Sequence, residues 1–219
     1  MIYRGKRLTM SVHLIVSLGW LGAVLAYLAL AVTGLVSRDA EVVRGAYGAM
    51  TLVGWAVIVP LSLAALVSGL VKSVDTPWGV LRYWWVCAKG VLTVGGIGVL
   101  LSHMQAVTRM SDLAMTTALS PTALRLERVQ LVVHAVGGLL LLSGLTVLSV
   151  YKPWGLTPFG RRAGYAAPRV PAAIGALAAE PRGVGLRRAF RWQRVVGVHV
   201  VALSAALVLF HIASGGMRR

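Results

Sequence analysis

Long runs of apolar residues, separated by short polar segments, dominate the chain. A hydrocarbon core of about 30 Å takes roughly 20 apolar residues of α-helix to cross. Five segments reach that length: Met10 to Ser37, Ala46 to Val71, Tyr83 to His103, Val129 to Tyr151, and Val195 to Ser214. The pattern predicts an all-α fold, an integral membrane helical bundle with five transmembrane helices.

The spacing of these spans divides the chain into three parts. Residues 1–151 hold four spans, which we expect to form two hairpins and a transmembrane core. Residues 152–194 form a basic loop rich in Arg, Gly, Pro and Ala, and residues 195–219 form the fifth span with a short tail. The first apolar run far exceeds the roughly 7 to 15 residues of a signal peptide, so we expect it to be retained.

Prolines punctuate the two hairpins. Pro60 predicts a kink in the second span, because proline cannot donate to the carbonyl of Ala56. The sequence TPWG follows the second span at residues 76–79, and KPWG follows the fourth at residues 152–155. In each, proline stops the helix and tryptophan suits the headgroup level. The two similar exits suggest a duplicated hairpin.

Composition and charge support a membrane location. Of 219 residues, 58% are hydrophobic and 13% charged, which is not typical of a soluble globule. The net charge of +16 does not indicate nucleic-acid binding, because the basic residues lie beside the apolar runs. With the N-terminus inside, fourteen Lys and Arg flank the spans on the cytoplasmic side and seven on the outside. This bias predicts an N-inside, C-outside topology.

Histidine, lysine and methionine side chains fall into two layers at the two ends of the predicted spans. The inner layer comprises His13, Lys89 and His199. The outer layer comprises His103, His134 and His211, with Met50, Met104, Met110 and Met115. Each layer therefore contains several residues that can ligate a metal.

Helical spacing places several of these residues on shared faces, since residues 7 or 14 positions apart lie near the same side of a helix. In the first span the stripe is His13, Ser17, Trp20 and Tyr27, and in the third it is Trp85, Lys89, Thr93, Gly96 and His103. Glycines at positions 95, 96, 98, 137 and 138 permit close approach of another helix or of a flat ligand. A haem between helices requires a nitrogen ligand, small residues and aromatic edges.

Each of these residues also has a purely structural interpretation. Lys89 lies about 9 Å from the interface, a distance that a lysine stem largely covers by snorkelling. A histidine near a span end bonds headgroups or water, although His134 and His199 lie deeper. The outer methionines pack against lipid or a neighbouring helix as readily as they bind copper. The conjunction of deep histidines with a lysine at similar depth favours a functional site.

The sequence excludes several other chemistries. Cys87 is the single cysteine, so neither an internal disulfide nor a cysteine-based zinc cluster can form. The chain contains neither GxxxxGK[ST] nor HExxH. All six acidic residues fall outside the predicted spans, which disfavours a transporter driven by intramembrane carboxylates.

Two motifs resemble known families of small bacterial membrane proteins. HLIVSLGWLG, residues 13–22, resembles the first helix of the copper resistance protein D family and of the haem-dependent membrane protoporphyrinogen oxidases. WVCAKGVL, residues 85–92, resembles the third helix of those oxidases, and this likeness implies that His13 and Lys89 lie around a b-type haem. Over the first four spans the chain is most similar to a family of actinobacterial polytopic membrane proteins, a domain of unknown function, which implies a location in the bacterial cytoplasmic membrane.

Three functions remain open. In the first, b-type haem is held by His13, Lys89 and His199 inside, and by His134 with His103 or His211 outside, for membrane electron transfer or for oxidation of a small apolar reductant. In the second, copper is captured externally, since thioethers favour Cu(I). The residues proposed for this are Met104, Met110 and His134, with His103, Met115 and His211. In the third, the chain is a non-catalytic membrane subunit whose basic loop docks a membrane or cytoplasmic protein, or anionic lipid. The sequence does not decide whether the protein is an enzyme.

Overall fold

The computed structural model describes residues 2–74, 76, 79–116, 124–152 and 154–162, with side chains from Arg7 onward. The helices are α1 (Ile2–Val36), α2 (Ala40–Val53), the π-helical turn η1 (Gly54–Ile58), α3 (Val59–Val74), α4 (Trp84–Thr116), α5 (Arg125–Tyr151) and α6 (Pro158–Arg162). These described residues contain no strand, which confirms the all-α prediction for this part of the chain. The predicted fifth span, Val195 to Ser214, and most of the basic loop lie outside the described residues.

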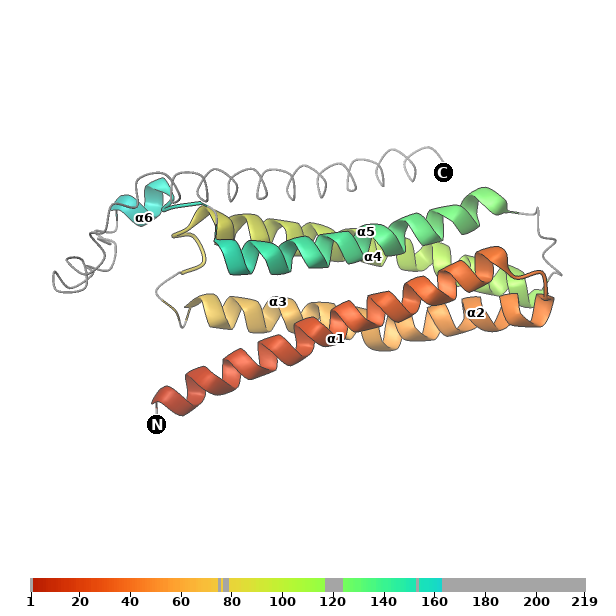
Figure 1. Cartoon of the computed structure of the whole chain (residues 1–219), viewed down its shortest axis with the longest axis horizontal. Helices are drawn as coiled ribbons and strands as arrows, with labels where there is room; N and C mark the ends of the chain where they lie inside the picture. Colours follow the sequence, from red (N-terminus) through yellow and green to blue (C-terminus); the bar gives the residue numbers. More distant parts are fainter. Residues whose placement is uncertain (1, 75, 77–78, 117–123, 153, 163–219) are drawn as a thin grey trace, which may run out of the picture.

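Four long helical rods form a bundle, and successive rods run in opposite directions (Figure 1). α1 packs against α2, α3 and α5, while α4 packs against α2, α3 and α5, so the rods close into a ring. Four described segments are long and apolar enough to cross a membrane: Arg7–Val36, Ala40–Val74, Trp84–Thr116 and Arg125–Tyr151. The first four predicted spans are thus compatible with a multi-pass membrane protein.

At the end of the bundle that holds the α1–α2 turn, here called the outer end after the predicted topology, the helices are longer than the apolar runs that predicted them. The third span was expected to end at His103, but α4 continues to Thr116. The extension is amphipathic: Met104, Val107, Met110 and Ala114 are buried at helical spacing, while the charged residues point outward. Packing against the bundle therefore keeps this segment helical, although it is more polar than the predicted third span.

A three-residue turn joins α1 to α2 at the outer end. The Ser37 hydroxyl accepts a hydrogen bond from the Asp39 N–H at 3.2 Å, and the Asp39 carboxylate caps α2 by accepting from the Glu41 N–H at 2.9 Å. Below the turn, Gly34 leaves room for the buried ring of Tyr47, since a Cβ at Gly34 would lie 2.7 Å from the Tyr47 Cζ. The first hairpin is therefore closed by a cap and by a helix contact that requires glycine.

Pro60 coincides with an irregularity in the second rod. The π-helical turn Gly54–Ile58 lies directly before it, and the Val59 N–H bonds to the Gly54 carbonyl. A π turn contains one extra residue and is wider than a regular turn. This local widening accommodates Pro60, which has no N–H to donate. Gly54 and Ile58 both point into the bundle and are buried.

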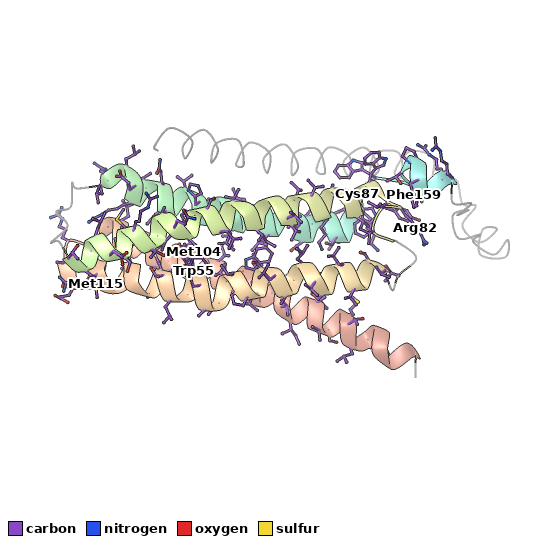
Figure 2. All side chains as sticks on the ribbon, turned by 180° about the vertical axis from the view of Figure 1, so that it is seen from behind. Trp55, Arg82, Cys87, Met104, Met115 and Phe159 are labelled. Atoms are coloured by element: carbon purple, nitrogen blue, oxygen red, sulfur yellow. The ribbon has the colours of Figure 1, made fainter. Side chains whose placement is uncertain are left out.

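The two loops that carry TPWG and KPWG lie side by side at the inner end. Tyr83 and Leu156 form an antiparallel bridge. The Thr157 N–H donates to the Arg82 carbonyl at 2.9 Å, and the Thr157 hydroxyl donates to the Leu81 carbonyl at 2.7 Å. Arg82 and Phe159 accordingly lie together at one end of the bundle (Figure 2). The segments that follow the two similar motifs are therefore hydrogen-bonded to each other.

Charge is distributed unequally between the two ends of the described structure. The four acidic residues described are Asp39, Glu41, Asp112 and Glu127, and all lie at the end that holds the α1–α2 turn. The opposite end, where α1 begins and α3 and α5 finish, has basic side chains and none of these acids: Arg7, Lys72, Arg82, Lys152, Arg161 and Arg162. The end that holds the α1–α2 turn also has five basic residues, Arg38, Arg44, Arg109, Arg125 and Arg128, so the asymmetry is one of acidic residues. The N-inside topology was predicted from Lys and Arg alone and stays a prediction.

Impermeant thiol labelling of whole cells tests the topology. In a Cys87→Ala background, we expect Arg38→Cys to be labelled from outside and Arg161→Cys only after the cells are broken, because positive residues are retained in the cytoplasm. Both positions are exposed. Labelling of Arg161→Cys alone on intact cells would show the opposite orientation.

Gly34→Ala tests the contact between α1 and α2. The added Cβ meets the buried Tyr47 ring, so we expect the free energy of unfolding in mixed micelles to fall by about 1–3 kcal/mol. Gly22→Ala on the same helix meets nothing within 4 Å and should be neutral or stabilising by up to about 1 kcal/mol. Equal effects at the two positions would contradict the packing.

Candidate functional site: an apolar cavity with a histidine pair

An apolar cavity lies inside the bundle between α1, α4 and α5. The enclosed part of the cavity has a volume of about 100 Å³, and it widens into an open mouth. Apolar side chains and glycines form most of its walls, and its polar groups are a tryptophan, a tyrosine and two histidines: Trp20 and Tyr27 of α1, His103 of α4, and His134 of α5. An apolar lining with a few convergent polar groups is typical of a site for an apolar small molecule or cofactor.

His103 and His134 are in contact at one end of the cavity. Their ring centroids are 4.6 Å apart and their planes differ by 14°, so the rings are stacked. The Tyr27 hydroxyl lies 3.4 Å from His103 Nε2, and the Tyr27 and His103 rings meet edge to face at 6.2 Å. The structure thus joins three residues from three helices, and it brings together two of the histidines predicted to form the outer layer.

The His134 ring is held in one tautomer. Its Nδ1 lies 2.7 Å from the backbone carbonyl of Gln130. A carbonyl only accepts hydrogen bonds, so Nδ1 carries the proton and Nε2 of the neutral ring carries the lone pair. Metal-binding histidines are commonly oriented by such a bond. His134 therefore has the chemistry of an Nε2 ligand.

The stripes predicted from helical spacing face the interior of the bundle to different degrees. Trp20 and Tyr27 of α1, and Trp85, Thr93 and His103 of α4, are buried, whereas the other members are half-buried: His13, Ser17, Lys89 and Gly96. The glycines are used in two ways. Gly96, Gly137 and Gly138 all line the cavity. A Cβ at Gly96 would in addition lie 2.6 Å from the Leu141 side chain, so this position also permits close helix packing. Gly95 and Gly98 have no such neighbour.

The inner-layer residues His13 and Lys89 do not line this cavity. His13 Nδ1 lies 3.0 Å from the Ser68 hydroxyl on α3, and Lys89 Nζ donates to the Ser149 hydroxyl on α5 at 2.7 Å. Each serine in turn donates to a carbonyl of its own helix, Ala65 and Leu145 respectively. Lys89 therefore bonds to a neighbouring helix in this structure, and its role in binding a cofactor stays a prediction. His199 and His211 lie outside the described residues.

The residues predicted to bind copper are separated by their packing. Met104 is 0% exposed, and its thioether occupies the space that a side chain at Gly54 would fill. Met110 is also buried in the hydrophobic core, whereas Met115 is 64% exposed. Met104 lies midway along the bundle and Met115 near its outer end (Figure 2). Among the described residues, no group of three or more His, Cys, Asp or Glu is arranged to hold a metal ion.

The residues present fit a single-histidine haem site better than a bis-histidine one. The His103 and His134 rings touch each other, so no macrocycle lies between them in this arrangement. His134, with Nδ1 held by the Gln130 carbonyl, would hold the iron of such a group. His103 then packs against the face of the His134 ring, and Gly137, Gly138 and Trp20 supply the small and aromatic walls that a flat ring needs.

Arg128 was interpreted from the sequence only as an external charge. In the structure it is 1% exposed and lies on the inward stripe of α5 with Leu131, Ala135 and Leu142. That register was readable from the sequence, because positions 128, 131, 135 and 142 recur at helical spacing. No signal in the sequence identified the Gln130 carbonyl as the partner of His134.

Comparison of the chain with protein-family models, curated proteins and solved structures gave no match.

A double-mutant cycle on Lys89 and Ser149 tests whether the lysine joins α4 to α5. We expect Lys89→Met and Ser149→Ala to be coupled by about 0.5–1.5 kcal/mol in the free energy of unfolding in mixed micelles, because each removes the same hydrogen bond. Thr146→Ala is the matched control: its hydroxyl also bonds back to its own helix, at Leu142, one turn earlier. Coupling near zero for both pairs would show that Lys89 only snorkels.

Proposed function

We propose that the chain is a multi-pass protein of the bacterial cytoplasmic membrane that binds b-type haem in the cavity between α1, α4 and α5. The observation that carries the proposal is an apolar cavity with a stacked histidine pair at one end. The bound haem supplies a one-electron redox centre, for electron transfer through the membrane or for oxidation of a small apolar reductant such as a quinol or porphyrinogen.

The chain's own residues have distinct parts in this proposal. His134 binds the iron through Nε2, and the Gln130 carbonyl holds its ring in the required tautomer. His103 packs on the His134 ring and shares a hydrogen bond with the Tyr27 hydroxyl, so this pair can hold a proton near the cavity. Val24, Leu100 and Leu142 line the cavity and exclude water from it.

The resemblance of residues 13–22 and 85–92 to the haem-dependent oxidases supports haem as the cofactor. That resemblance points to His13 and Lys89, which bond to serines on neighbouring helices. The cavity points instead to His103 and His134. The two assignments therefore place the haem in different halves of the bundle, and variants can distinguish them.

The absorption spectrum of the purified protein tests the proposal, recorded after haem-supplemented expression in the oxidised and dithionite-reduced states. We expect a Soret peak with sharp reduced bands. His134→Ala should abolish or strongly shift these bands, and His103→Ala should alter them, because these residues hold the ring. His13→Ala is the matched control, since His13 lies outside the cavity, and should retain full haem content.

The remaining outcomes separate the alternatives. Loss of haem only in His13→Ala or Lys89→Met would keep haem as the cofactor and move it to the inner layer. A featureless spectrum in every preparation would reject haem binding and leave copper handling or a subunit role to be tested.

A further inference from the structure

Arg128 is a charged side chain enclosed by the outer half of the bundle. It lies in the first turn of α5 and is 1% exposed. Charged side chains inside a membrane protein are expensive unless they are paired, and a guanidinium cannot escape the cost by deprotonation. The position therefore calls for an anion or for several hydrogen-bond acceptors.

Two guanidinium nitrogens of Arg128 are buried without an acceptor. The structure gives no hydrogen-bond partner for Nε or Nη2 among the residues it describes. These two atoms form one edge of the guanidinium, and their N–H bonds point in the same direction. That edge matches the two oxygens of a carboxylate, which it binds through parallel hydrogen bonds.

The Tyr47 hydroxyl is a second unpartnered polar group in the same region. Tyr47 is 0% exposed, and its hydroxyl also has no partner within the described part of the chain. Tyr47 lies on the buried face of α2 and Arg128 on the buried face of α5, and both elements begin at the end of the bundle that holds the α1–α2 turn. Gly34 admits the Tyr47 ring to this position. The two side chains together supply three buried N–H and O–H donors to one region.

Two acidic side chains at this end are engaged elsewhere. The Asp39 carboxylate caps α2, and the Glu41 carboxylate accepts from Arg44 Nη1 at 2.7 Å. Neither is placed to neutralise the guanidinium edge of Arg128 in this arrangement. Asp112 and Glu127 are the other acids described at this end, and neither is bonded to the Nε–Nη2 edge. Among the described residues, therefore, no carboxylate pairs with these donors.

We propose that the Nε–Nη2 edge of Arg128, with the Tyr47 hydroxyl, binds a carboxylate within the outer half of the bundle. The carboxylate belongs either to the molecule held in the histidine cavity or to a separate small anion. Arg128 precedes His134 by six residues, or about 9 Å along α5, which an acid side arm of a ring compound can bridge. A carboxylate on the molecule in the histidine cavity rests on the proposed function, whereas a separate small anion does not.

Two metal-free porphyrins test the first source without iron ligation as the readout. Protoporphyrin IX has two free carboxylates, and its dimethyl ester has none. We expect the full-length wild-type protein to bind the acid about tenfold more tightly or better, measured by porphyrin fluorescence in detergent, because bidentate charge-assisted hydrogen bonds are lost in the ester.

Variants locate the effect. Arg128→Gln should remove the preference for the acid, and Arg128→Lys should restore only part of it, because lysine keeps the charge but lacks the two-pronged edge. Tyr47→Phe should reduce the preference severalfold. Arg125→Gln is the matched control, because Arg125 lies three residues earlier on α5 and is exposed. This variant should keep the wild-type ratio of acid to ester affinity.

Thermal unfolding in sodium acetate and in sodium chloride at equal ionic strength tests the second source. If acid and ester bind alike but acetate raises the Tm of the wild type and not that of Arg128→Gln, the site binds a separate anion. If neither porphyrin binds, the proposed cavity fails and the acetate comparison alone decides the Arg128 site. Equal binding of acid and ester together with no acetate effect would overturn the proposal.

Discussion

A serine or threonine hydroxyl that bonds to a side chain of a neighbouring helix and donates to its own backbone joins helices at three places in this bundle. Lys89 donates to Ser149, which donates to the Leu145 carbonyl. Trp55 Nε1 donates to the Thr108 hydroxyl at 3.3 Å, and Thr108 donates to the Met104 carbonyl. In an apolar medium a donor without an acceptor is costly. A small hydroxyl can accept a hydrogen bond from a long side chain of another helix while its own proton is donated to a backbone carbonyl, so both donors are satisfied.

These links separate the two halves of the bundle chemically. In the inner half, His13 and Lys89 have hydroxyl partners within the protein. The cavity lies about midway along the helices, with the stacked histidines at its end toward the predicted outer side, and the unpartnered donors of Arg128 and Tyr47 lie in the outer half. Ligand binding releases the most free energy where groups have not already been satisfied by the fold. The structure therefore directs the search for a ligand to the outer half, although the motif resemblance concerns the inner one.

The sequence predicted which segments are helical far better than how they meet. Apolar length is a property of one segment, and the first four spans agree with four long helices. The inward stripes also follow from one helix at a time, which is why Trp20, Tyr27 and His103 were correctly placed on shared faces. The contact between His103 and His134 depends on the rotation and depth of two helices relative to each other, and periodicity within either helix does not contain that information.

The irregular second rod shows how one residue type affects the cavity. Pro60 has no N–H to give, and the preceding turn widens so that Val59 bonds five residues back to Gly54. The widened turn points Gly54 and Ile58 inward: Gly54 admits the Met104 thioether, and Ile58 forms part of the cavity wall. Positions four residues apart share a face in a regular α-helix as well, so the main effect of the extra residue in the π turn is to rotate the helix that follows it relative to the helix that precedes it. Pro60, from which the sequence predicted only a kink, therefore affects the shape of the candidate site through the π turn that precedes it.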